Sequence, residues 1–155
     1  MRYFLMILSC LFLSSYVDQS VYAALPSPFI SGELVVLTRQ GTESFYQDQQ
    51  GNYGGLEYDL LQQFALQQGW RLKLLVAPEN ELIGLLEQGK AHIIAAGLAI
   101  TPARQQRLQF ALPYQRVRQQ IVYHTDSPKP NQTDDLLGKK IFIQQGSGYS
   151  ETLHY

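Results

Sequence analysis

Residues 92–110 hold the feature that most constrains the fold, an apolar run that stops at a glycine shortly before a helix start. The run from His92 to Ala96 is typical of a buried strand, and Gly97 lets the chain leave a sheet without a Cβ penalty. Thr101 is a favoured N-cap, and Pro102 suits the first helical position because its missing N–H has no intrahelical partner. The segment therefore predicts a strand, a loop of small residues and a helix that begins at about Pro102.

Arg104 falls in the first turn of this predicted helix. Free backbone N–H groups and the helix dipole favour negative charge at that end, and the planar guanidinium pairs with a carboxylate through two hydrogen bonds. This pattern indicates an anion-binding loop. An ordinary capped turn with a solvent-exposed arginine is the alternative, and the residues alone leave both interpretations open.

Strand and helix patterns alternate along the chain before this loop. Short apolar runs rich in branched residues predict strands, and apolar residues at helical spacing that end at a glycine predict helices. Such alternation with short connections predicts an α/β fold, in which helices flank a parallel sheet. We expect strands at 33–38, 71–76 and 92–96, helices at 56–69 and 80–89, the second capped by Asn80, and a polar loop at 39–55.

Ligands of such sheets bind outside the carboxyl ends of the strands. The loop after the first strand carries Phe45 and Tyr46, and the loop after the third strand carries Gly97. An aromatic face beside an arginine suits a small amphipathic anion, although either ring is equally suited to fill the core under its loop. Glu57 opens the first helix, as a favourable first-turn charge or as a partner for a ligand amine.

The C-terminal part of the chain predicts a crossover into a second lobe. We expect strands at 119–123 and 138–143, the second leading into a loop of small residues at 144–148. Because no lysine follows Gly146-Ser147-Gly148, this loop is a weak signal for phosphate binding. One or two strands cannot cover the faces of a second sheet, so we expect a complete lobe 1 at about 32–115 and a truncated lobe 2 at about 116–155.

The N-terminus predicts secretion. Arg2 precedes an apolar stretch that is too short to anchor in a bilayer, and Val21-Tyr22-Ala23 is the small-x-small ending that a signal peptidase accepts. We expect a signal peptide at 1–23 and a linker at 24–31. Lipidation of Cys10 is the alternative; otherwise the mature chain has no cysteine for disulfide or thiolate chemistry.

Composition argues against several function classes. The formal net charge of the 155 residues is −1, which gives no electrostatic footprint for nucleic acid. The three histidines are scattered without ligand-like spacing, so we expect no metal. No nucleophile–base pair and no cofactor motif stands out. We expect the chain itself to be catalytically inert.

Six segments taken in order resemble family 3 periplasmic solute-binding proteins: GELVVLTR, the FY pair, GGLEYDLLQQFA, AAGLAITPARQQRLQFALPY, QQIVY and LLGKKIFIQQGSG. The resemblance covers essentially all of residues 32–155 and implies two α/β lobes, joined by hinge strands, that close on an amino acid or similar solute. Ala99 departs from the family pattern, in which Ser or Thr is usual. The ligand contacts that the resemblance implies are Tyr46, Gly97, Ala99, Arg104, Ser147 and Gly148, with Phe45, Glu57 and Thr101 as further candidates.

The resemblance implies a periplasmic protein and leaves two functions open. The first is a receptor that binds a carboxylate-bearing solute, an amino acid or a peptidoglycan-derived compound, and delivers it to an ABC-type membrane transporter. The second is a regulatory module fused to a catalytic domain that cleaves peptidoglycan, because the EYDL, AAGL and QQIVY spellings are most similar to membrane-bound lytic murein transglycosylases of type F. The second function also implies association with the outer membrane.

Overall fold

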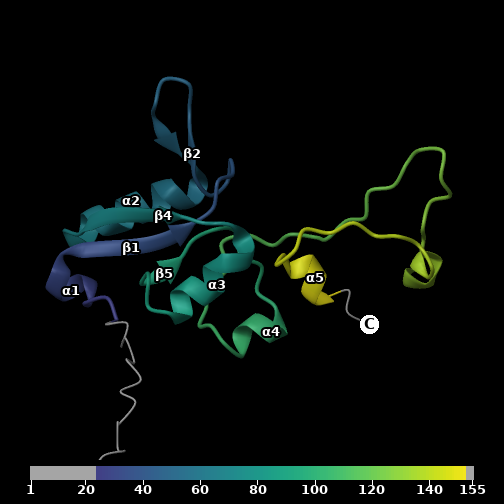
Figure 1. The fold of residues 1–155 in the computed structure, drawn as a ribbon. Helices are drawn as coiled ribbons and strands as arrows, with labels where there is room; N and C mark the ends of the chain where they lie inside the picture. The colour runs from purple at the N-terminus through teal and green to yellow at the C-terminus, as the bar shows by residue number, and fades with distance from the viewer. Residues whose placement is uncertain (1–23, 153–155) are drawn as a thin grey trace, which may run out of the picture.

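The computed structural model describes residues 24–152, so the predicted signal peptide, including Cys10, lies outside the described residues. A three-stranded parallel sheet forms the centre of the fold, in the order β4-β1-β5 (Figure 1). Glu33 pairs with Arg71 at one end of this sheet, and Thr38 pairs with Val76 at the other. The strands are β1 (Glu33–Thr38), β4 (Arg71–Val76) and β5 (Ile93–Ile94).

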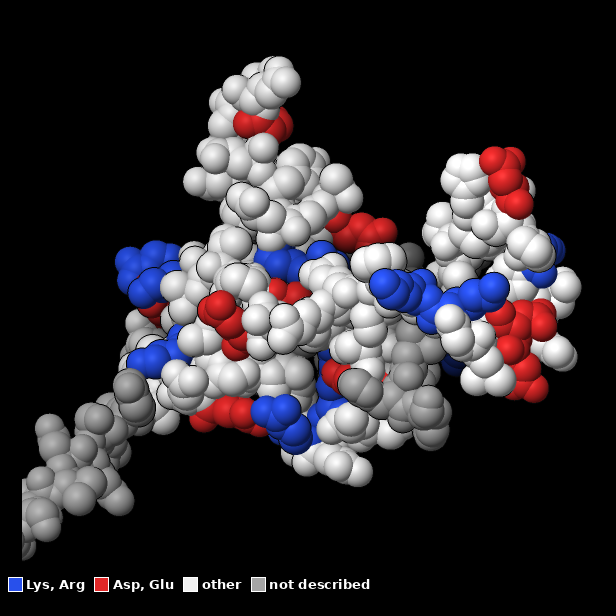
Figure 2. All heavy atoms as spheres, turned by 45° about the vertical axis from the view of Figure 1, so that its right-hand side comes forward, with Lys and Arg blue, Asp and Glu red and all other residues white. Residues whose placement is uncertain are grey.

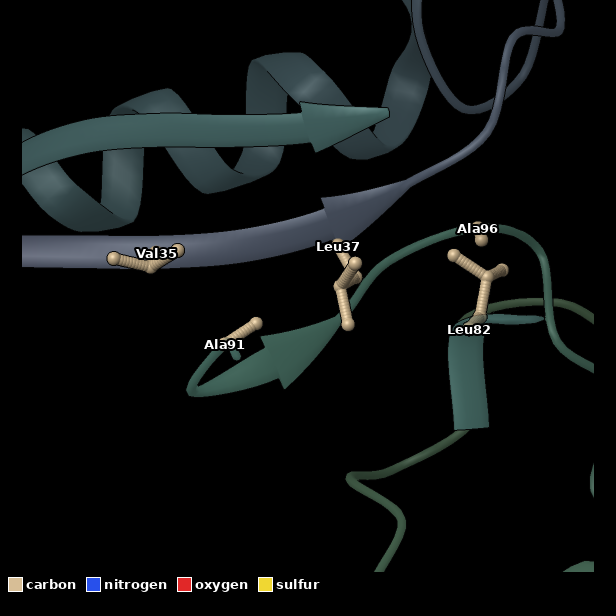
Figure 3. Packing of buried hydrophobic residues seen from close by; sticks show 5 residues of the cluster. All are labelled: Val35, Leu37, Leu82, Ala91 and Ala96. Carbon is tan, nitrogen blue, oxygen red and sulfur yellow. The ribbon is translucent and has the colours of Figure 1, made fainter. Parts of the chain in front are cut away.

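Two helices cover the two faces of the sheet, α2 (Leu56–Gln68) and α3 (Glu79–Glu87) (Figure 1). Successive side chains of a strand point to opposite faces, so β1 supplies both cores. On the α3 side, Val35 and Leu37 pack with Leu82, Ala91 and Ala96 (Figure 3). On the α2 side, Leu34 and Val36 pack with Ala65. The predicted α/β class, a parallel sheet with flanking helices, is confirmed.

The helix boundaries agree with the sequence prediction at two of four places. Gly69 ends α2 in the left-handed conformation with φ 71°, and the Thr101 hydroxyl accepts the Arg104 N–H at the start of α4 (Pro102–Gln105). The helix predicted to end at Gly89 stops at Glu87. The prediction that Asn80 caps α3 was wrong, because Pro78 takes the extended cap position and the helix starts directly after it.

Two segments that were expected to be irregular contain regular structure. A short helix, α1 (Pro28–Ser31), lies in the expected linker, with proline at its first position. The expected polar loop contains a hairpin of β2 (Tyr46–Gln47) and β3 (Tyr53–Gly54). Its turn is held by the Asp48 carboxylate, which accepts the N–H groups of Gln50 and Asn52.

Beyond α4 the chain makes a long excursion and returns, bringing α5 (Gly148–Thr152) back beside α4 (Figure 1). The excursion contains one 3₁₀ turn, η1 (Thr133–Leu136). The strands predicted at 119–123 and 138–143 are absent, because each needs a paired ladder and a buried face. Val122 and Phe142 are instead 94% and 91% exposed. The division into lobes at about residue 115 stays a prediction.

No helix within residues 24–152 is long and apolar enough to span a membrane, and no group of three or more metal-ligating side chains lies within that range. Acidic and basic side chains are interspersed over the face shown in Figure 2.

Candidate ligand-binding site

Arg104 lies at the contact between α4 and α5, and its side chain is 2% exposed. Its Nε donates a hydrogen bond of 2.7 Å to Glu151 Oε1. Its two terminal NH₂ groups donate to backbone carbonyls, Nη2 to Gly146 at 2.8 Å and Nη1 to Ala99 at 3.3 Å. The guanidinium is therefore fixed in one orientation by α5 and by the loops on either side.

The Glu151 carboxylate is held by two different donors of the Thr101–Arg104 turn. The Thr101 hydroxyl donates to Oε2, while Arg104 donates to Oε1. Partial burial raises the pKa of the Glu151 carboxyl, but the hydrogen bonds from Thr101 and Arg104 outweigh burial, so this pKa lies below its ordinary value of 4.5. The turn thus binds a carboxylate here, and that carboxylate belongs to the chain itself.

The structure brings five of the predicted site residues together at this contact. Ser147 is 5% exposed, and its hydroxyl donates to the Gln144 carbonyl at 2.6 Å. Gly148 packs so closely that a Cβ there would lie 3.1 Å from the Ala99 Cβ. The contact is therefore close-packed, with little room between its two sides. The five residues are Ala99, Thr101, Arg104, Ser147 and Gly148.

Gly97 and Glu57 contact one another. The Gly97 N–H donates to both oxygens of Glu57, at 3.0 and 2.8 Å, and the Tyr114 hydroxyl donates to Oε1 at 3.0 Å. Burial and the adjacent Glu57 charge raise the pKa of Tyr114 to about 12. The sequence prediction required both groups to be free for a guest. In this structure the Gly97 N–H and the Glu57 carboxylate are bound to each other, so neither is free.

The structure does not bring the aromatic pair to Arg104. Tyr46 lies on the β2–β3 hairpin, which projects away from α4 (Figure 1). The Phe45 ring lies 5.3 Å from the Tyr53 ring and 5.7 Å from the Tyr58 ring, measured between centroids. These rings border a hollow of about 650 Å³ between α2 and β4, which Trp70 also lines. Phe45 packs against the Tyr53 and Tyr58 rings and belongs to neither of the two buried core clusters.

Sequence reasoning missed Arg39, Glu79 and Glu151. Glu79 Oε2 lies 3.9 Å from Arg39 Nε, and Glu79 Oε1 lies 4.0 Å from Arg104 Nη2, so its carboxylate stands between two guanidinium groups. Arg39 directly follows β1, and its place at the carboxyl end of a strand was a usable signal. No local pattern marks Glu151, because its role depends on a contact with Arg104, which lies 47 positions earlier in the chain.

A match to a family model identifies the family of this chain. The model of bacterial extracellular solute-binding proteins, family 3, matches residues 34–145. This chain belongs to that family. The match runs from the second residue of β1 to Gln145, two residues before Ser147, so it includes residues of every strand of the sheet.

Curated relatives of this family 3 chain are named membrane-bound lytic murein transglycosylase F. The protein from Methylobacillus flagellatus is 36% identical over 133 residues, which are 83% of this chain and 28% of the relative. That from Nitrosospira multiformis is 32% identical over 154 residues, 99% of this chain and 32% of the relative. The chain spans about a third or less of these relatives.

Solved structures of amino-acid-binding proteins share the fold. An ancestral cationic amino acid solute binding protein has a TM-score of 0.54 at 28% identity, and the match covers 57% of this chain and 39% of that one. The arginine-bound form of domain 1 from TmArgBP has a TM-score of 0.53 at 29% identity, with 59% and 73% covered. The periplasmic-binding-protein-like architecture is therefore shown, with partial coverage.

Proposed function

We propose that this domain binds a small, carboxylate-bearing solute in the bacterial envelope, at the turn that contains Thr101 and Arg104. The observation that carries the proposal is the carboxylate already bound there, that of Glu151. A hydroxyl and a guanidinium on one short turn form charge-assisted hydrogen bonds with both of its oxygens. A guest carboxylate offers the same two acceptor atoms and takes the place of Glu151.

The charges around this turn are consistent with an exchange of one carboxylate for another. Arg39 and Arg104 are balanced by Glu79 and Glu151. Release of Glu151 into water leaves one positive charge in excess, and a monoanionic guest restores the balance. The guest then contacts Arg104 from lobe 1 and the Ser147–Gly148 loop from α5. Binding shifts the equilibrium towards the arrangement that makes both sets of contacts.

The relatives favour a second candidate with the same binding step. Their names support a module that accompanies a peptidoglycan-cleaving catalytic domain, in which solute binding regulates the enzyme instead of feeding a transporter. In either case the described residues act as a binding domain, and in the second case catalysis belongs to another part of the protein. Reading the coding sequence downstream of Tyr155 separates the two: a lysozyme-like domain supports the module, and a second completed lobe followed by a stop supports the receptor.

Calorimetry on the full-length protein tests the binding site, with amino acids and peptidoglycan-derived peptides as probes. Arg104→Gln removes the charge that pairs with the guest and should weaken binding at least about 30-fold. Arg107→Gln is the matched control, because Arg107 pairs in the same way with Glu87 on the surface, and it should change affinity less than about twofold. Equal affinities of Arg104→Gln and wild type would refute the assignment.

Glu151→Gln gives an independent reading if Arg104→Gln does not fold. A carboxamide competes less well than a carboxylate for a guanidinium, so this substitution should tighten guest binding by about tenfold. Glu87→Gln, which alters the surface pair, should leave the affinity unchanged. Weaker binding by Glu151→Gln would mean that Glu151 supports the guest instead of competing with it.

A further inference from the structure

Arg39 is a second guanidinium at the carboxyl end of the sheet. Its Nε donates to the Ala96 carbonyl at 2.8 Å, which fixes the side chain across the end of β5. Neither terminal NH₂ group of Arg39 donates a hydrogen bond to any residue within 24–152. The side chain is 35% exposed and lines a hollow of about 580 Å³, together with Asn80 and Gln144. Arg39 is thus held by a hydrogen bond at Nε, while Nη1 and Nη2 form no hydrogen bond within residues 24–152.

Beside Gly97, close to Arg39, lies a buried hydroxyl without a partner among the described residues. Ser44 Oγ is buried and has no hydrogen-bond partner in the described part of the chain. A Cβ placed on Gly97 would lie 3.7 Å from this oxygen and 3.4 Å from Arg39 Nη2. Buried polar side chains are nearly always hydrogen-bonded. Gly97 is therefore flanked by two groups with unused hydrogen-bonding capacity in the described part of the chain, the terminal NH₂ groups of Arg39 and the Ser44 hydroxyl, although neither Gly97 nor Ser44 lines the hollow.

The terminal NH₂ groups of Arg39 offer an anion a place to bind. Glu79 is the acidic group nearest to Arg39 among the ion pairs of the described residues, and it also faces Arg104. The separation of 3.9 Å from Arg39 Nε leaves the terminal NH₂ groups of Arg39 free to form shorter, charge-assisted hydrogen bonds. Glu79 lines this hollow together with Arg39, so a guest there meets one carboxylate and one guanidinium.

We propose that Arg39 is a second anion-binding residue of the site and that the solute carries a second acidic group, which Arg39 recognises. This inference rests on the proposed function, in which Arg104 takes the first carboxylate. It assigns the domain to dicarboxylic solutes. The solved neighbours are named for a cationic amino acid and for arginine, so the assignment separates this chain from them.

Matched pairs of probes test the inference by calorimetry on the full-length protein. L-glutamate and L-glutamine differ only in one carboxylate, as do L-aspartate and L-asparagine. Wild type should bind one of the acids at least about tenfold more tightly than its amide, because a charge-assisted hydrogen bond is replaced by a neutral one. Arg39→Gln should bring that ratio close to one, because it removes the charge that distinguishes the acid from the amide.

Arg71→Gln is the control variant. Arg71 is a guanidinium at the opposite end of the sheet, paired with Glu33 on the surface, and its loss should leave the ratio unchanged. A ratio in Arg39→Gln equal to that of wild type overturns the inference. A wild-type protein that binds L-arginine or an amide better than either acid also overturns it, whether or not the variant folds. Both of these outcomes leave the proposed function standing, whereas a protein that binds no carboxylate of any kind refutes the proposed function as well.

Discussion

Gly97 shows how a residue without a side chain shapes the loop that follows β5. Its φ of 63° lies in the left-handed region, and its N–H donates to Glu57. A Cβ at this position would lie 3.4 Å from Arg39 Nη2. The sequence predicted a strand at 92–96 that stops at Gly97, but β5 covers only Ile93–Ile94, so the strand ends earlier and Gly97 turns the chain within the loop that follows. Its role as a backbone donor to a guest stays a prediction, because its donor is already bound to Glu57 in this arrangement.

Gly97→Ala should therefore destabilise the fold, since it combines a left-handed backbone with a Cβ placed 3.4 Å from Arg39 Nη2. We expect a loss of about 1–2 kcal/mol in the free energy of unfolding, measured by urea denaturation. Gly84→Ala is the matched control, because Gly84 lies inside α3 with nothing within 4 Å of the new atom. This change should raise the free energy of unfolding by about 0.5–1 kcal/mol. Equal effects at the two positions would contradict the role given to Gly97.

Ser44→Ala should leave the ligand-free protein as stable as wild type, or more stable by up to about 1 kcal/mol. The hydroxyl is buried without a partner, so its removal also removes a desolvation cost. Thermal unfolding without and with saturating solute measures both states. A clear loss of stability in the ligand-free protein would show that the hydroxyl has a partner in solution.

Among the elements, those that depend on local pattern were predictable and those that depend on distant partners were not. The strand at Glu33–Thr38 is an apolar run between polar residues, and Gly69 marks the end of α2. By contrast, residues 138–143 have the composition of a strand but no partner to pair with. The hairpin of β2 and β3 was missed because its strands are two residues long and its turn depends on the Asp48 side chain.

Docking of α5 should depend on pH through Glu151. The pKa of this carboxyl is lower in the docked state than its ordinary value of 4.5, so its contribution to stability is complete above pH 4.5. The contribution is lost as the pH falls through the lowered pKa. The NMR resonance of the Arg104 Nε–H should report this, with a position that is constant from neutral pH to about 4.5 and changes below it. In Glu151→Gln the acid-dependent change should disappear.

At the scale of the whole molecule, the sheet order explains where the site lies. Parallel strands bring the end of β1, with Arg39, and the end of β5, with Gly97, to the same edge. The fold class and this edge were predictable from alternation and strand ends alone. The occupant of the Arg104 turn was not, because Glu151 returns to it only after the long excursion of residues 113–147 (Figure 1).

The tethered carboxylate of α5 also sets a threshold for what the domain responds to. A group held on the same chain competes as though it were dissolved at roughly millimolar concentration. A simple monocarboxylic acid, which offers Arg104 nothing that Glu151 lacks, gains no advantage at lower concentrations. If a guest displaces Glu151 as proposed, only a solute with additional contacts opens the turn when it is scarce, and the common small acids do not.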